Sequence, residues 1–155
     1  MDHYVEQFLA DTHATYRLHE HEAITTATEG KALRSFPVSA LVKCLAFAIA
    51  DHRFVLVALR ADDRADYKKI AATLHISRQQ LRAATEDEIT GSLHMLPGGV
   101  GPFPFGGATV VIDAAVQAIP TVYCGTGSRH TTLEIGAEEL IRISAAIIAD
   151  VAKTG

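Results

Sequence analysis

The chain has 155 residues, of which 48% are apolar and 21% charged, and its formal net charge is −4. This length and composition are typical of one globular domain with an ordinary hydrophobic core, and they exclude a disordered or fibrous protein. We therefore expect a single domain over residues 1–155. The acidic charge and a pI near 6.0 disfavour a protein that coats DNA or other duplex nucleic acid.

The two cysteines, Cys44 and Cys124, lie far apart in the chain, so they predict neither a metal framework nor a disulfide scaffold. The N-terminus has no basic region followed by an apolar run, which argues against a secretory signal. The longest apolar stretches are about ten residues, roughly half of a membrane span. We expect a cytoplasmic protein that does not enter a membrane.

Hydrophobic periodicity and capping residues predict the elements of the first half of the chain. They are a helix over 3–11, a strand over 16–19, a Thr26-capped helix over 27–33, and a hairpin of two buried strands, 40–50 and 54–59, around a turn at 51–53.

The second half mixes capped helices with short strands. Its expected elements are a helix from Asp62-Asp63 to Leu74, a helix from Ser77 to Ala83, a Thr85-capped turn ending near Gly91, a loop over 97–107, strands at 109–112, 122–124 and 131–135, and a helix over 137–151. Helices and strands do not alternate strictly, which predicts an α+β or mixed α/β fold with roughly six strands, partly antiparallel, and helices outside.

Lys43 is the single charged residue in the apolar run from Ala40 to Ala50. A strand of this composition is typically buried on both faces, so its lysine is expected to face an apolar interior or a cleft. In a cleft, the ammonium would stabilise negative charge in a transition state, which makes Lys43 the candidate catalytic residue. The alternative is a lysine near a strand end whose ammonium reaches water.

Two glycine-rich segments are candidates for ligand contact. The loop over 97–107 contains five glycines and three prolines, so its backbone is stiff and open to close approach by a ligand. Such a loop suits an oxyanion hole or an amino-acid pocket, or is simply a turn-rich connection. The segment 125–130 resembles an anion-binding nest, or is a hairpin turn, and it matches neither a Walker loop nor a dinucleotide fingerprint.

Other catalytic patterns are missing from the sequence. His19 and His21 would share one face of a strand, yet no third metal ligand is evident. There is no Gly-x-Ser-x-Gly elbow, and neither cysteine stands in an activating polar context. We expect no metal and no other cofactor.

Taken together, these segments resemble the YbaK/aminoacyl-tRNA synthetase-associated domain family, which includes prolyl-tRNA editing domains. The resemblance extends from about Tyr16 to Ser144. The segments that carry it are His19–Glu22 before a Thr-capped helix, Val42–Leu45, Asp66–Ala71, Gly98–Phe103 and Gly125–Arg129.

The resemblance implies a mixed six- or seven-stranded sheet or partial barrel flanked by helices. It also implies hydrolysis of the ester between a wrong amino acid and the 3′ end of tRNA, with Lys43 as the key residue. The family is thought to use neither a metal nor a protein nucleophile, because a ribose hydroxyl of the tRNA assists water. The implied partners are the acceptor end of mischarged tRNA and, optionally, an aminoacyl-tRNA synthetase.

The expected substrate-binding residues combine these motifs. They are His21, Gly98, Gly99, Val100, Gly101, Pro102, Gly125, Gly127, Ser128, Arg129 and His130. The basic residues expected to contact tRNA are Lys31, Arg34, Lys68, Lys69 and Arg129.

The sequence departs from the family pattern at two places. Gly101 stands where many members carry Ser, Thr or Cys before the proline, and residues 91–96 differ from the commoner members. A backbone-walled pocket without that side chain is expected to accept small aminoacyl groups such as Ala, and Gly101→Val is expected to narrow acceptance while leaving the fold intact.

Three functional hypotheses remain open from the sequence. The first is a free-standing deacylase that edits mischarged tRNA in trans. The second is a non-catalytic module of the same fold that binds tRNA or a synthetase. The third is a small-molecule binding protein that keeps only the fold. Lys43 in its apolar strand favours the enzyme, whereas the acidic net charge leaves the binding modules open.

Overall fold

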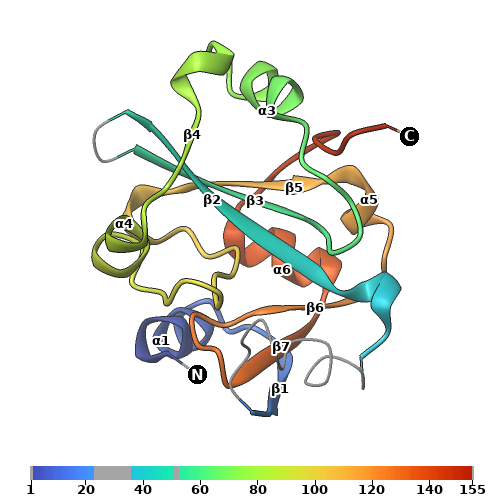
Figure 1. Cartoon of the computed structure of the whole chain (residues 1–155). Helices are drawn as coiled ribbons and strands as arrows, with labels where there is room; N and C mark the ends of the chain where they lie inside the picture. Colours follow the sequence, from blue (N-terminus) through green and yellow to red (C-terminus); the bar gives the residue numbers. More distant parts are fainter. Residues whose placement is uncertain (1, 23–35, 51–52, 155) are drawn as a thin grey trace.

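The structure is a computed structural model that describes residues 2–22, 36–50 and 53–154 (Figure 1). Its elements are α1 (His3–Asp11), β1 (Tyr16–Glu20), η1 (Val38–Ala40), β2 (Val42–Ala50), β3 (Arg53–Arg60), α3 (Tyr67–Thr73), η2 (Arg78–Gln80), β4 (Arg82–Ala83), α4 (Glu86–Gly91), η3 (Phe105–Gly107), β5 (Thr109–Asp113), α5 (Ala114–Gln117), β6 (Thr121–Gly125), β7 (Thr131–Gly136), α6 (Ala137–Ser144) and β8 (Ile147–Ala149). The helix predicted over 27–33 lies outside the described residues. No helix in the described part of the chain has the length and apolarity that crossing a bilayer requires.

The described strands form two sheets. The smaller sheet has the order β1-β7-β6 and is antiparallel throughout. The larger has the order β4-β2-β3-β5-β8, with β2 antiparallel to β3 and β4, and β5 parallel to β3 and β8. A parallel bridge between Leu41 and Tyr123 brings the start of β2 beside β6. The predicted α+β class is confirmed, and its strands are divided between two sheets.

The predicted hairpin is confirmed as β2 and β3, which pair from Val42 opposite Arg60 to Ala50 opposite Arg53. β3 lies in the middle of its sheet and is apolar on both faces, as expected for a strand covered on two sides. Its alternate residues join two separate core clusters, one with α3 and one with α1 and the small sheet. Figure 1 shows α3 on one side of the large sheet, and α6 and the small sheet on the other.

Local capping signals locate two helices. α1 spans the predicted residues 3–11, and its N-cap, Asp2, accepts a hydrogen bond from the N–H of Tyr4. Thr85 caps α4 through the predicted capping box with Glu88. Both helices depend on contacts within one turn, which a short stretch of sequence contains in full.

The helix expected from Asp62 begins later, at Tyr67. Asp66 caps it instead, because its carboxylate accepts from the N–H groups of Lys68 and Lys69 at 3.0 and 3.2 Å. Asp63 lies in the preceding turn and forms an ion pair with Arg60 at 3.2 Å. Asp63 and Asp66 are both of a residue type that favours an N-cap. Asp66, which lies three residues nearer the helix, makes the capping hydrogen bonds.

The helix predicted from Ser77 to Ala83 is wrong. The chain makes one turn of 3-10 helix, η2, and then the short strand β4. Two residues of β4 pair with β2, with Ala83 opposite Phe47. This pairing satisfies backbone groups that the remaining turns of a helix would have used.

The helix predicted over 137–151 is also too long. α6 ends at Ser144, and Ala145 adopts a left-handed conformation with φ 51° that reverses the chain. The next apolar residues form β8 along β5, with Ile148 opposite Ile112. The Val151 N–H then donates to Asp113 Oδ1 at 2.8 Å, which ties the end of the chain to β5.

Candidate functional site

The predicted segments meet around one cavity of about 360 Å³. Its walls are the start of β2 over 41–46, the glycine-rich loop over 97–100, and the facing parts of β6 and β7. Segments far apart in the sequence meet there because the bridge between Leu41 and Tyr123 holds β2 beside β6. Of the residues expected at the site, Lys43, Gly98, Gly99 and Val100 line the cavity.

The cavity lies along an edge of β2 that no described strand covers. One edge of β2 pairs with β3 along its length. On the other edge, β4 pairs only with Phe47 and Ala48, and the backbone bridge to β6 lies at Leu41, just before the strand begins. The six consecutive residues from Leu41 to Ala46 therefore line the cavity, whereas a strand that offered one face would contribute alternate residues.

Lys43 supplies the one formal charge of the cavity, because no Asp, Glu, Arg or His is among its described lining residues. The residue is half-buried. No described carboxylate forms an ion pair with it. Among the described residues, removal of this ammonium would leave no buried acidic partner without a counterion.

The glycine-rich loop packs its backbone directly against the end of β6. A Cβ on Gly101 would lie 2.2 Å from the carbonyl oxygen of Gly125, and a Cβ on Gly99 would lie 2.7 Å from that of Ser128. The Gly127 N–H donates to the Gly99 carbonyl at 2.7 Å, which locks the two segments together. Glycine is required at these positions by close approach of the two backbones.

Gly101 and Pro102 were expected in the wall of the pocket, but they are not among the residues that line the cavity. The missing side chain of Gly101 points at β6 and at the ring of Phe103, whose Cε2 would lie 2.4 Å from the added Cβ. The expectation that Gly101→Val leaves the fold intact is therefore wrong. Residue 101 acts on the pocket only by setting how closely the loop approaches β6.

The turn between β6 and β7 divides its predicted residues into two groups. Gly125 and Ser128 line the cavity, whereas Gly127, Arg129 and His130 are outside its lining. Arg129 instead donates from Nε to the Pro97 carbonyl at 3.0 Å, a second link between this turn and the glycine-rich loop.

His21 does not line the cavity itself, but it contacts a residue that does. Its Nε2 lies 2.8 Å from the hydroxyl oxygen of Thr132 on β7. Thr132 is almost fully buried in the cavity wall, 4% exposed. Thr132 could not be identified from the sequence, because no pattern of neighbouring residues distinguishes a threonine in a strand. It is the pairing of β1 with β7 that brings Thr132 close to His21.

Tyr123 is a second lining residue that the sequence did not single out. Its ring stacks on Phe36, with the ring centroids 5.0 Å apart. Burial and the neighbouring Glu134 carboxylate raise the pKa of its phenol, so the hydroxyl keeps its proton near neutral pH. Glu134 is also bound by His19, whose Nε2 lies 2.9 Å from its Oε1. Of these groups, only Tyr123 lines the cavity, and Glu134 and His19 are outside its described lining.

Both cysteines line the cavity, yet neither is an activated nucleophile. Burial raises the pKa of Cys124 to about 12. Burial and the nearby Cys124 raise the pKa of Cys44 well above its ordinary value. Because the thiolate is the nucleophilic form of cysteine, both side chains are inert thiols at neutral pH.

The histidines do not gather into a metal site in the described part of the chain, where no three His, Cys, Asp or Glu side chains come together. His19 binds Glu134, and His21 binds Thr132. Nε2 of His19 and both ring nitrogens of His21 are thus engaged in hydrogen bonds.

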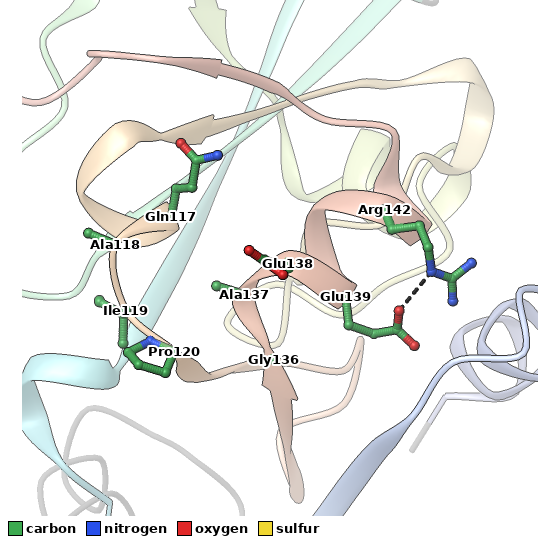
Figure 2. Close-up of a pocket in the computed structure, with 9 residues that line it drawn as sticks. All are labelled: Gln117, Ala118, Ile119, Pro120, Gly136, Ala137, Glu138, Glu139 and Arg142. Atoms are coloured by element: carbon green, nitrogen blue, oxygen red, sulfur yellow. Dashed lines mark hydrogen bonds and ion pairs between the residues drawn. The ribbon is translucent and has the colours of Figure 1, made fainter.

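A larger hollow of about 880 Å³ lies between α5 and the start of α6 (Figure 2). Its lining carries two carboxylates, Glu138 and Glu139, against one guanidinium, Arg142. Hydrogen bonds from Arg142 Nε and the Thr15 N–H, at 2.7 and 2.8 Å, lower the pKa of Glu139 to about 2. This acidic hollow would repel a phosphate group, and none of the predicted site residues lines it.

Several solved structures share the fold of this chain over nearly its whole length. The chain resembles a solved structure of a proposed trans-editing enzyme for prolyl tRNA synthetase (23% identity, 97% of this chain and 95% of that one, TM-score 0.81). It also resembles the hypothetical protein APE2540 (24% identity, 96% of this chain and 99% of that one, TM-score 0.82). A third similar structure is a scaffold protein used for epitope grafting (20% identity, 97% of this chain and 96% of that one, TM-score 0.81). At these identities the likeness shows the fold alone.

A search of curated proteins found no match. The model of the aminoacyl-tRNA editing domain matches residues 21–143, which is most of the chain and includes every segment that lines the cavity. The chain therefore belongs to the aminoacyl-tRNA editing domain family.

Proposed function

We propose that the protein is a free-standing aminoacyl-tRNA deacylase of the cytoplasm that hydrolyses the ester of mischarged tRNA carrying a small amino acid. The observation that carries the proposal is the cavity in which Lys43 is the one formal charge among the described lining residues, in a chain of the editing family. Such a cavity attracts a group that is anionic or becomes anionic during reaction.

Hydrolysis in this site proceeds by attack of water on the carbonyl carbon of the ester. The carbonyl oxygen gains negative charge as the tetrahedral intermediate forms, and the Lys43 ammonium stabilises that charge. The intermediate then collapses: the carbonyl double bond re-forms, the bond to the ribose oxygen breaks, and the ribose oxygen takes up one of the two protons of the attacking water. The amino acid leaves as its carboxylate, and the second proton passes to solvent. The protonated thiols of Cys44 and Cys124 agree with a mechanism in which water, and no protein side chain, is the nucleophile.

The size of the cavity supports a small acyl group. Its volume of about 360 Å³ is near the lower end of ligand-binding pockets and must hold the ester as well as the amino-acid side chain. The Gly98–Val100 wall is held by backbone contacts to β6, so it cannot retreat from a large side chain without strain.

A deacylation panel tests the proposal. With tRNAs mischarged with Ala, Ser, Cys, Thr and Phe, we expect fastest clearance of the alanyl ester, slower clearance of the seryl and cysteinyl esters, and no clearance of the phenylalanyl ester. One methylene is worth only about 1–3 kcal/mol, so the small groups will be poorly separated. The reaction is expected to continue in EDTA. Faster loss of the Phe ester than of the Ala ester would refute the small pocket, and binding without turnover would favour the non-catalytic module.

The salt dependence of tRNA binding gives a further prediction. Lys69 donates to Asp150 Oδ2 and to the Ala152 carbonyl, at 3.0 and 2.8 Å, and Arg129 donates to Pro97, so two of the expected basic residues are already engaged. Lys31 and Arg34 lie outside the described residues. We expect the slope of log Kd against log salt to correspond to about two to four phosphates. A slope that corresponds to eight or more would indicate an extended duplex interface.

A further inference from the structure

The hydroxyl of Thr132 has a defined orientation in the cavity wall. His21 Nδ1 lies 2.7 Å from the carbonyl oxygen of Glu22, and a carbonyl oxygen only accepts hydrogen bonds. In the neutral imidazole, Nδ1 therefore carries the proton and Nε2 is the acceptor. Nε2 lies 2.8 Å from Thr132 Oγ1, so the threonine hydroxyl donates its proton to the ring.

This bond leaves Thr132 as an acceptor toward the cavity. Its one donor is committed to His21, and its oxygen lone pairs remain available to a ligand. The other hydroxyls of that wall differ: Thr131 bonds to the hydroxyl of Thr126, and Ser128 accepts from the His130 N–H. No carboxylate is among the described lining residues. A cationic donor in the cavity must therefore be met by neutral oxygens. Two of these belong to hydroxyls whose proton is directed to a residue outside the lining: Thr132, which donates to His21, and Tyr123, which is hydrogen-bonded to Glu134.

The strand order separates Thr132 from the cationic wall. Lys43 is on β2 and Thr132 on β7, and β6 lies between these strands, because it pairs with β7 and is bridged to the start of β2. Two strand spacings correspond to roughly 10 Å between the backbones. The cavity thus offers a cation on β2 and an oriented acceptor on β7, with β6 between them.

We propose that Thr132 accepts a hydrogen bond from the α-ammonium group of the aminoacyl ester, and that His21 is the positioning residue that holds the threonine oxygen toward it. This inference rests on the proposed function. An aminoacyl ester carries a cationic N–H donor one bond from the carbonyl carbon that is attacked. With the carbonyl oxygen near Lys43 and the ammonium near Thr132, the ester spans the cavity and each charge meets a suitable partner.

The test compares two esters of one tRNA that differ only in the amino group, alanyl-tRNA and propionyl-tRNA. In Thr132→Val the shape of the side chain is kept and the acceptor is lost. We expect kcat/KM for the alanyl ester to fall about 10- to 100-fold, mainly through KM, which is the range for one hydrogen bond to a charged group. The propionyl ester should lose less than twofold, and Thr132→Ser, which keeps the hydroxyl, should restore hydrolysis of the alanyl ester.

His21→Ala tests the positioning role. It should reproduce the pattern of Thr132→Val, with a loss for the alanyl ester and little for the propionyl ester. The double variant should be no worse than Thr132→Val alone, because the two residues act through one hydrogen bond. Additive losses would overturn the positioning role of His21.

The outcomes separate this inference from the proposed function. Equal losses on both esters in an active enzyme would overturn the role of Thr132 alone, since they would indicate contact with the ribose or a purely structural effect. A wild-type protein that hydrolyses neither ester would overturn the proposed function itself. Thermal melting of each variant identifies losses that come from unfolding.

Discussion

Replacement of Lys43 by alanine is expected to lower the single-turnover rate of deacylation about a hundredfold or more while the protein stays folded. Lys43 is the one formal charge among the described residues that line the cavity. The loss of a charge contact to a transition-state oxyanion typically costs about 3 kcal/mol, which corresponds to a factor of about a hundred in rate. The fold should tolerate the change because no described carboxylate depends on this ammonium.

A matched control is available in Lys153, an exposed lysine outside the cavity lining. Lys153→Ala removes the same charge from the molecule, so it corrects for a change in overall attraction to tRNA. Its rate should equal that of the wild type at saturating enzyme. A Lys43→Ala variant with a near-normal single-turnover rate would remove Lys43 from the mechanism and leave the cavity as a binding site only.

Gly101→Val is expected to destabilise the fold strongly. The added Cβ would lie 2.2 Å from the Gly125 carbonyl oxygen and 2.4 Å from Phe103 Cε2, and the backbone oxygen belongs to a paired strand that cannot move aside. Overpacking costs typically about 1–3 kcal/mol, and a clash with backbone belongs at the upper end of that range. For a chain of this length, Tm should fall by about 6–12 °C.

Thermal melting followed by circular dichroism measures this effect, and the chain supplies a control. A Cβ on Gly91, in α4, meets no atom within 4 Å. Gly91→Ala should therefore be neutral or raise stability by about 0.5–1 kcal/mol, the usual gain when alanine replaces a helical glycine. Gly125→Ala should behave like Gly101→Val, since its Cβ would lie 2.5 Å from the Val100 carbonyl oxygen. A Gly101→Val protein that melts with the wild type would show that the loop and β6 separate easily.

The elements that were predicted correctly are those whose signals lie within a few residues. Thr85 and Glu88 complete a capping box within one turn, and α4 begins there. The two apolar runs around a short polar turn form β2 and β3, because neighbouring strands joined by a tight turn pair with each other. In the large sheet, the predictions were wrong where a strand pairs with a segment distant in the sequence. The segments predicted as parts of helices form β4, which pairs with β2, and β8, which pairs with β5.

The residues of the candidate site also divide into those that the sequence indicated and those that depend on distant segments. Lys43 and the Gly98–Val100 wall could be named from residue type and family resemblance, and both line the cavity. Gly101 was assigned to the wall from the same motif, but it faces β6. Thr132 was not named, because nothing nearby in the chain distinguishes it from Thr131. One of these two hydroxyls bonds to His21 and the other to Thr126.

The sequence by itself determined the α+β class, the family, the central hairpin and the cation of the cavity. These depend on local periodicity, capping and residue type, which a single chain displays directly. Only the tertiary structure decided which edge of β2 stays uncovered, how closely the glycine-rich loop approaches β6, and which of the two threonine hydroxyls is hydrogen-bonded to His21. These features depend on strand register and on contacts between distant segments, and a shift of one residue in register moves every side chain of a strand to the other face of its sheet.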